Sequence, residues 1–244
     1  MHGAGNDFVL LHASEPAQGW AALAKILCDR RFSVGSDGLV VAEQRGDDLW
    51  MRMWNPDGSE AEMCGNGLRC FGAYAVAQEL VSGSDFEVVT KAGRHQISVG
   101  AKDLVSCTMG EPTLLAADLD LAPLPLKGTS VSMGNPHLVV EGDPALAARL
   151  GAQLEKHPLF PNRTNVHFAR VINGQIEMAT WERGAGLTLA CGTGACATAF
   201  ALRRQVTLPV RVNVPGGWVE IDSSGNDYVL RGPVETVFTG AIEA

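Results

Sequence analysis

The chain has 244 residues, which is enough for one large domain or two smaller ones. Hydrophobic residues make up 46% and charged residues 19%, a balance typical of folded globular proteins and not of disordered ones. The net charge of −8 argues against a general nucleic-acid-binding protein, which needs a surface of Lys and Arg. No run is apolar enough to span a membrane and no signal peptide is evident, so we expect a cytoplasmic protein without a membrane partner.

Short runs rich in Val and Ile predict β-strands, and two Ala- and Leu-rich runs without Pro predict helices. In chain order the predicted elements are strands at 8–11, 39–41 and 49–54, a helix at 65–80, strands at 86–89, 96–99, 138–140 and 175–180, a helix at 192–204, and strands at 210–214 and 218–221. Several strands around one main helix in each half of the chain predict an α+β fold.

The two halves of the chain resemble each other. Residues 54–67 (WNPDGSEAEMCGNG) and 181–194 (WERGAGLTLACGTG) both run from a Trp to a Cys-Gly-x-Gly motif, and the step between them is 127 residues. Upstream, Gly-Asn precedes an apolar run twice, and the step from Asn6 to Asn135 is 129 residues. Two short matches in the same order at nearly the same offset indicate two homologous halves.

We therefore predict two pseudo-symmetric lobes, each a mixed or antiparallel sheet or barrel around one main helix. The predicted boundaries are 1–112 for the N-terminal lobe and 113–232 for the C-terminal lobe, and residues 233–244 are expected to return to the first lobe. The Pro- and Gly-containing stretch at 110–130 is interpreted as the linker.

Cys64 and Cys191 are the candidate reactive residues, because each lies where a loop becomes a glycine-rich helix. The first turn of a helix carries unpaired N–H groups and the positive end of the helix dipole. A thiolate is stabilised there, which lowers its pKa and makes it a usable base. The same N–H groups can hold a carboxylate, and the glycines let a ligand approach the backbone.

Two such half-sites are suited to inverting a stereocentre. One thiolate removes a proton from one face of a carbon while the other thiol delivers a proton to the opposite face. An amino-acid α-hydrogen is weakly acidic, so the developing charge on the carboxylate must also be stabilised, for which helix N-termini are suited. The remaining cysteines are expected to be buried packing residues: Cys28, Cys70, Cys107 and Cys196.

These motifs, with residues 3–8 (GAGNDF), 134–137 (GNPH) and 182–186 (ERGAG), resemble the diaminopimelate epimerase family. The resemblance covers nearly the whole chain. It implies two similar α/β lobes with the site in the cleft between them, and a last strand near 234–238. It also implies a homodimer that needs no pyridoxal phosphate, other cofactor or metal. The implied reaction interconverts LL- and meso-2,6-diaminopimelate, a small amino acid used to make lysine and peptidoglycan.

The resemblance also assigns roles to single residues by matching position. Cys64 and Cys191 are the implied acid and base. Backbone N–H groups hold the reacting carboxylate at Gly65, Asn66, Gly192 and Thr193. His137 and Glu182 match the pair that tunes the thiols and contacts the substrate amine. The other residues expected to bind substrate are Asn6, Asn55, Asn135, Asn165 and Arg183. Amide groups and one Arg can bind the carboxylate and the ammonium group at the second amino-acid end of the substrate.

Three alternatives remain open from the sequence. A racemase of the same architecture could act on proline or hydroxyproline. A binding or scaffold protein could keep the fold without catalysis. A thiol redox protein could form a disulfide between Cys64 and Cys191, although the chain has no Cys-x-x-Cys motif.

Overall fold

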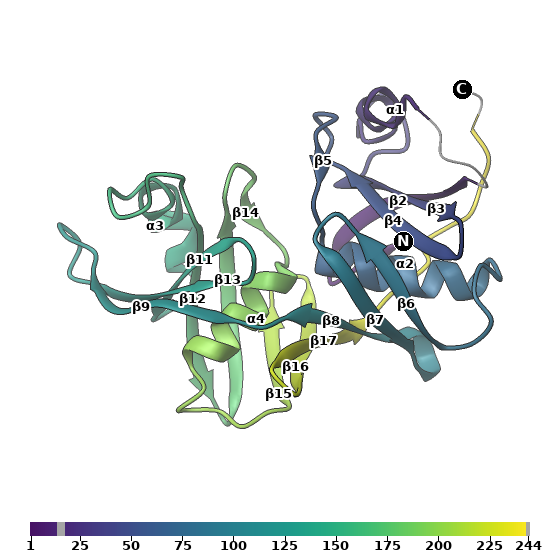
Figure 1. Ribbon diagram of the computed structural model, residues 1–244. Coiled ribbons are helices and arrows are strands. Elements are labelled where there is room, and N and C mark those ends of the chain that lie inside the picture. The colour runs from purple at the N-terminus through teal and green to yellow at the C-terminus, as the bar shows by residue number, and fades with distance from the viewer. Residues whose placement is uncertain (14–17, 243–244) are drawn as a thin grey trace. The chain divides into compact units, whose positions relative to one another are not determined.

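The chain forms two compact units in the computed structural model, which describes residues 1–13 and 18–242 (Figure 1). The first unit contains Met1–Cys107 and Gly232–Ala244, and the second contains Thr108–Arg231. The chain passes into the second unit within strand β8 (Leu104–Gly110) and returns within β17 (Asp227–Pro233). The sequence placed these two crossings at residues 112/113 and 232/233.

The first unit contains two helices among its strands. In chain order its elements are β1 (His2–Gly3), β2 (Asn6–Ala13), α1 (Trp20–Leu27), β3 (Gly38–Arg45), β4 (Asp48–Trp54), β5 (Glu60–Ala61), α2 (Gly65–Ala77), β6 (Asp85–Thr90), β7 (Gly93–Val99), a 3₁₀ turn (Ala101–Asp103) and the first part of β8. Near the C-terminus, Glu235 forms an isolated bridge with His2. The prediction of a strand at 234–238 is therefore wrong, because Glu235 is the one residue of this range that pairs with another strand.

The second unit repeats this order. Its elements are β9 (Thr113–Asp120), β10 (Lys127–Ser132), β11 (Pro136–Glu141), α3 (Leu146–Glu155), β12 (Asn165–Ile172), β13 (Gln175–Glu182), β14 (Gly186–Thr188), α4 (Gly192–Ala201), β15 (Val210–Val214), β16 (Gly217–Ser224) and β17. No helix among the described residues has the length and apolar character needed to cross a membrane.

Strand pairing confirms that the two units are homologous in architecture. β2 pairs parallel with β3, and β11 pairs parallel with β12. The following hairpins are antiparallel in both units, and β4 with β6 matches β13 with β15 as parallel pairs. Even the register repeats, since Leu39 lies opposite Trp54 and Val166 lies opposite Trp181. The predicted α+β class with two similar units is confirmed.

One helix in each unit is buried among strands, as the sequence predicted. α2 contacts β1, β2, β3, β4 and β7, and α4 contacts β10, β11, β12, β13, β15 and β16. Both helices carry buried residues on all sides, which explains why they are rich in Ala and Gly and poor in charge. Their predicted C-terminal ends, at 80 and 204, lie three residues beyond the observed ones.

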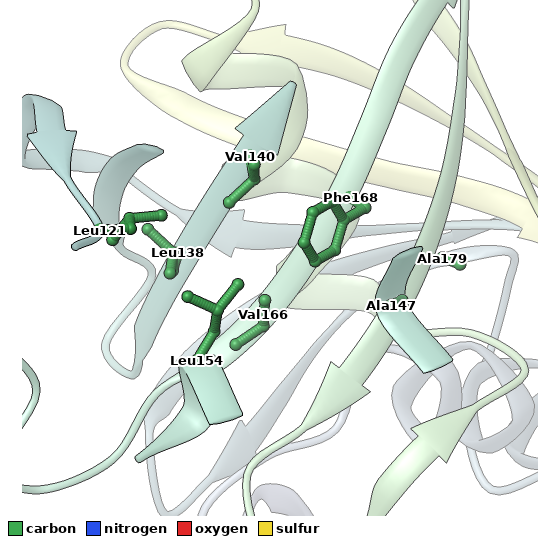
Figure 2. Packing of buried hydrophobic residues seen from close by; sticks show 8 residues of the cluster. All are labelled: Leu121, Leu138, Val140, Ala147, Leu154, Val166, Phe168 and Ala179. Atoms are coloured by element: carbon green, nitrogen blue, oxygen red, sulfur yellow. The ribbon is translucent and has the colours of Figure 1, made fainter. Parts of the chain in front are cut away.

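Helices α1 and α3 were not predicted. Each packs on the opposite face of the sheet from the central helix, α1 against β3 and β4 and α3 against β12 and β13. Figure 2 shows the second of these layers, where Leu138 and Val140 of β11 and Val166 and Phe168 of β12 pack near Leu154 of α3. Helices of only eight and ten residues are marginal in isolation, so tertiary packing stabilises them.

The stretch at 110–130 is not a linker. β9 and β10 form an antiparallel hairpin there, and β10 continues the sheet by pairing with β11. The prolines that suggested a linker, Pro123 and Pro125, lie in the connection between the two strands, where no ladder hydrogen bonds are lost.

Candidate functional site

Cys64 and Cys191 occupy equivalent positions at the start of the two central helices. Each is the N-cap residue, with φ −140° and ψ 119° at Cys64 and φ −130° and ψ 112° at Cys191. Each N-cap carbonyl accepts the first helical hydrogen bond, from Leu68 and Ala195. Neither first turn contains an acidic residue. The helix dipole at both thiols is therefore not offset by a negative side chain within that turn.

The other four cysteines are buried packing residues, as predicted. Their exposures are 4% for Cys28, 0% for Cys70, 1% for Cys107 and 0% for Cys196. Burial raises the pKa of the Cys70 and Cys107 thiols to about 12. Such thiols stay protonated near neutral pH and are poor bases.

Around Cys64, the structure brings together three of the predicted residues. The Cys64 thiol donates to Asn6 Oδ1 at 3.7 Å, and Asn66 Nδ2 donates to the same oxygen at 3.2 Å. Asn6 Nδ2 in turn donates to Asp37 Oδ2 at 2.8 Å, and the exposed Arg30 guanidinium donates to Asp37 Oδ1. The Asn6 amide is thus held with its oxygen toward the thiol.

Asn55 forms its hydrogen bonds with residues of its own turn and not with the group around Cys64. It follows β4, and its Nδ2 donates to Ser59 Oγ at 3.0 Å. Its backbone N–H and carbonyl bond Ser59 and Gly58, so Asn55 closes the β4–β5 turn. Gly65 and Asn66 form the first turn of α2, and both are buried.

Around Cys191, the Thr193 hydroxyl lies 3.6 Å from the sulfur, within hydrogen-bonding distance. Gly192 and Thr193 form the first turn of α4. One residue further, Gly194 packs directly on His167, because a Cβ at this position would lie 2.3 Å from His167 Cε1. His167 is joined to His137, and His137 to Asn135, by hydrogen bonds of 2.8 Å each.

His137 is fully buried and uncharged near neutral pH. Burial lowers its pKa well below the ordinary value, and electrostatic interaction with the neighbouring His167 and with the positive charge of Arg183 acts in the same direction. The family resemblance implied that His137 tunes the pKa of the thiols. A neutral imidazole acts on a thiol only as a dipole and hydrogen-bonding group, and not as a cation.

Asn165 and Glu182 hold the backbone and side chains near the end of β13. Asn165 Nδ2 donates to the Pro136 carbonyl and its Oδ1 accepts from the Arg183 N–H, both at 2.9 Å. Both ends of this amide therefore bond the backbone, which joins the start of β11 to the end of β13. Glu182 Oε1 accepts from the Thr188 hydroxyl at 2.7 Å, and the Arg183 side chain is exposed.

Two buried residues, one in each unit, were missed by sequence reasoning. His167 was not selected, although it lies two residues after Asn165 and so shares its face of β12. Arg69 is the single charged residue of α2 and is fully buried. Its guanidinium nitrogens have no hydrogen-bond partner within residues 1–13 and 18–242, and Nη2 lies against Gly3. A charged or ionisable residue inside an apolar element is the signal that could have identified both.

Glu155 anchors the loop that carries Arg183. Its carboxylate, 3% exposed, accepts hydrogen bonds from Trp181 Nε1 at 2.9 Å, Gly184 N–H at 2.8 Å and Arg163. Burial by itself would raise the pKa of Glu155, but these bonds outweigh it and lower the pKa below its ordinary value.

The depressed pKa makes Glu155 a source of stability at neutral pH that is lost in acid. We expect Glu155→Gln to lower the free energy of unfolding at pH 7 by about 2 kcal/mol. The difference from wild type closes as the pH falls through the depressed pKa, because the native carboxylate is then protonated. Urea denaturation from pH 7 to pH 3 measures this. Glu177→Gln is the control, since its pair with Arg170 is half exposed and contributes little. Equal effects of both variants would contradict the assignment.

Among the residues with described structure, no cluster of three or more His, Cys, Asp or Glu side chains is grouped as in a metal site. The side chains and backbone groups that the sequence selected in the two units are thiols, helix N-termini and amide, imidazole, carboxylate and guanidinium groups.

Comparison with known proteins identifies the family. The family model described as diaminopimelate epimerase matches residues 1–115 and 129–237. The chain belongs to the diaminopimelate epimerase family. A diaminopimelate epimerase from Desulforudis audaxviator is 44% identical over 273 residues, covering 98% of this chain and 96% of that protein. One from Azoarcus sp. is 42% identical over 268 residues and covers 100% of this chain and 97% of the relative.

Solved structures support the fold more widely. A hydroxyproline epimerase from Agrobacterium vitis superposes with a TM-score of 0.66 at 14% identity, covering 95% of this chain and 86% of the other. A phenazine biosynthesis protein of the PhzF family from Enterococcus faecalis gives a TM-score of 0.68 at 12% identity, with coverage of 93% and 87%. At these identities the likeness concerns the fold alone.

Proposed function

We propose that this protein interconverts LL- and meso-2,6-diaminopimelate without a cofactor, in the supply of lysine and peptidoglycan precursors. In this proposal Cys64 and Cys191 act as the base and acid. The observation that carries it is the pair of cysteines that cap equivalent helices with nearly the same backbone angles, in a chain of the diaminopimelate epimerase family.

The reaction moves one proton at each thiol. The thiolate of one cysteine takes the α-proton, and the electron pair is delocalised into the adjacent carboxylate. The thiol of the other cysteine gives its proton to the opposite face of the same carbon. The two cysteines end with their protonation states exchanged, so the next turnover of the same isomer requires proton exchange with solvent.

The helix N-termini supply the electrostatic stabilisation. The carboxylate gains negative charge as the α-proton leaves, and N–H groups of the first turns of α2 and α4 can donate to it. Gly65, Asn66, Gly192 and Thr193 are the residues proposed to hold it. Neither helix offers a competing carboxylate in its first turn, which leaves these positions open to the anion of the substrate.

The second amino-acid end of the substrate is proposed to be read by polar groups near the ends of β11 and β13. Arg183 presents an exposed guanidinium and Asn135 a half-buried amide. Glu182 offers a carboxylate for an ammonium group. Both ends of the Asn165 amide form hydrogen bonds with the backbone. We therefore propose that Asn165 positions Pro136 and Arg183 and also contacts the substrate.

Turnover assays with single isomers test the proposal. We expect LL- and meso-diaminopimelate to interconvert without added pyridoxal phosphate or metal, and L-proline to remain unconverted. Conversion is followed by chiral chromatography, and exchange of the α-hydrogen in D₂O by NMR. Exchange of the proline α-hydrogen alone would overturn the substrate assignment and favour a proline or hydroxyproline racemase.

A further inference from the structure

Four side chains of the second unit form one chain of hydrogen bonds. Asn135 Oδ1 lies 2.8 Å from His137 Nε2, His137 Nδ1 lies 2.8 Å from His167 Nε2, and His167 Nδ1 lies 2.9 Å from Thr180 Oγ1. The exposures of the last three residues are 0%, 0% and 2%. In β12, Val166 and Phe168 face α3, so His167 faces the other side of the sheet, where Gly194 of α4 contacts it.

The first unit shows that the fold does not need this polar chain. Register places Phe8 opposite Gly38 as it places His137 opposite Asn165. It likewise places Val40 opposite Met53 as it places His167 opposite Thr180. The first unit therefore fills these positions with the apolar residues Phe8, Val40 and Met53, all buried. Burying two imidazoles and a hydroxyl is costly unless they are bonded, so another role accounts for them.

The hydrogen bonds have a defined direction. Burial lowers the pKa of His167 to about 3 and that of His137 well below its ordinary value, so each neutral ring has one N–H and one lone pair. Asn135 Oδ1 only accepts, which places the proton of His137 on Nε2. His137 Nδ1 must then accept from His167 Nε2–H.

The hydrogen bond from Thr180 has the same direction, and this direction determines which atoms of the Asn135 amide are available to a substrate. His167 Nδ1 accepts from the Thr180 hydroxyl, so all three bonds run toward Asn135. The Asn135 oxygen is occupied, while its Nδ2 has no hydrogen-bond partner in the described part of the chain. The equivalent Asn6 is held in the opposite sense, with its Nδ2 bonded to Asp37.

We propose that His167 is a positioning residue that sets which end of the Asn135 amide meets the substrate. It acts by holding His137 in the Nε2–H tautomer, with Thr180 holding His167 in turn. Asn135 then offers two N–H donors, which suit a carboxylate of the substrate. If the hydrogen bonds ran in the reverse direction, Asn135 would present its amide oxygen instead, which suits an ammonium group. The inference rests on the proposed role of Asn135 in substrate binding.

Three variants test the inference. His167→Val places the residue of the first unit at this position, and Thr180→Val removes only the donating hydroxyl. His167→Gln keeps an N–H donor and an acceptor at this position of the hydrogen-bond chain. Thr198→Val is the matched control, because Thr198 is equally buried in α4 and its hydroxyl has no partner among the described residues. Urea denaturation of each variant shows that it is folded before kinetics are measured.

We expect His167→Val to raise KM for diaminopimelate roughly 10- to 100-fold with a much smaller change in kcat, because the lost donor contributes to binding. Thr180→Val has a weaker effect of the same kind, His167→Gln restores part of the affinity, and Thr198→Val matches wild type. Unchanged KM in folded His167→Val would overturn the proposal, as would a fall confined to kcat.

A second measurement separates this inference from the proposed function. Nitrogen-15 NMR of the labelled histidines reports which ring nitrogen carries the proton. We expect the Nε2–H tautomer for both His137 and His167 in wild type, and a shift of His137 away from it in His167→Val. An Nδ1–H form of His137 in wild type would overturn the inference even if diaminopimelate is turned over. Absence of turnover with the expected tautomers would refute the proposed function instead.

Discussion

Replacing either Cys64 or Cys191 with alanine is expected to lower the rate of diaminopimelate epimerisation by about a thousandfold or more. Each thiol is proposed to act on one face of the α-carbon, and a positioned acid or base contributes roughly 10²- to 10⁴-fold. Neither cysteine has a second thiol at its helix start that could replace it, since the remaining cysteines of α2 and α4 are fully buried. Rates are measured with LL- and meso-substrate separately.

Exchange with D₂O distinguishes loss of one base from general damage. A variant with one thiol can still remove a proton from one face and return solvent deuterium to the same face. We therefore expect one variant to exchange the α-hydrogen of the LL-centre and the other to exchange only that of the inverted centre, both without inversion. Cys70→Ala and Cys196→Ala are controls in the same helices and are expected to keep both activities. Exchange of the same isomer by both active-site variants would contradict the two-base mechanism.

Gly194→Ala is expected to destabilise the second unit by about 2–3 kcal/mol and to lower activity at least tenfold. The added Cβ would lie 2.3 Å from His167 Cε1 and 2.9 Å from both ring nitrogens, so the ring or the start of α4 must move. Either movement displaces Cys191 from its position at the helix N-terminus. The helix preference of Ala over Gly offsets about 1 kcal/mol of this cost.

Gly67→Ala is the matched control in the first unit. There the Cβ would lie 3.2 Å from Met51 Cε and 3.6 Å from Met53 Sδ, the ends of flexible side chains, and 3.5 Å from Cys64 Cβ, an ordinary van der Waals contact. We expect its free energy of unfolding to remain within about 1 kcal/mol of wild type. Combining Gly194→Ala with His167→Val is expected to destabilise by less than the sum of the two changes, because the ring that obstructs the Cβ is gone. Equal destabilisation by both glycine variants would contradict this account.

Much of the fold follows from the repeat in the sequence. The Trp and Cys-Gly-x-Gly pairs at a step of 127 residues correspond to the ends of β4 and β13 and the starts of α2 and α4. These features are local, because a cysteine before glycines and an Ala-rich run specify a helix start with few long-range contacts. The same locality explains why α2 and α4 were predicted while the short helices α1 and α3, which depend on packing, were not.

The strand β12 shows where pattern reasoning failed. Its counterpart β3 carries an apolar run and was predicted, whereas β12 carries Asn165 and His167 among apolar residues. Both strands lie between two helices and are buried on both faces, so alternation of polar and apolar residues is not required of either. The polar residues that hid β12 are those that build the hydrogen-bond chain and hold Arg183.

The sequence by itself indicated that the chain is a duplicated α+β protein of the diaminopimelate epimerase family, and it predicted Cys64 and Cys191 as the reactive pair, because these signals lie within contiguous motifs. Only the tertiary structure decided how the polar groups around them are oriented. Asn6, Asn135 and Asn165 are alike in sequence, yet Asp37, His137 and the backbone of Pro136 and Arg183 hold their amides in different ways. Hydrogen-bond direction depends on partners from other strands, and those partners meet only when the sheet has formed.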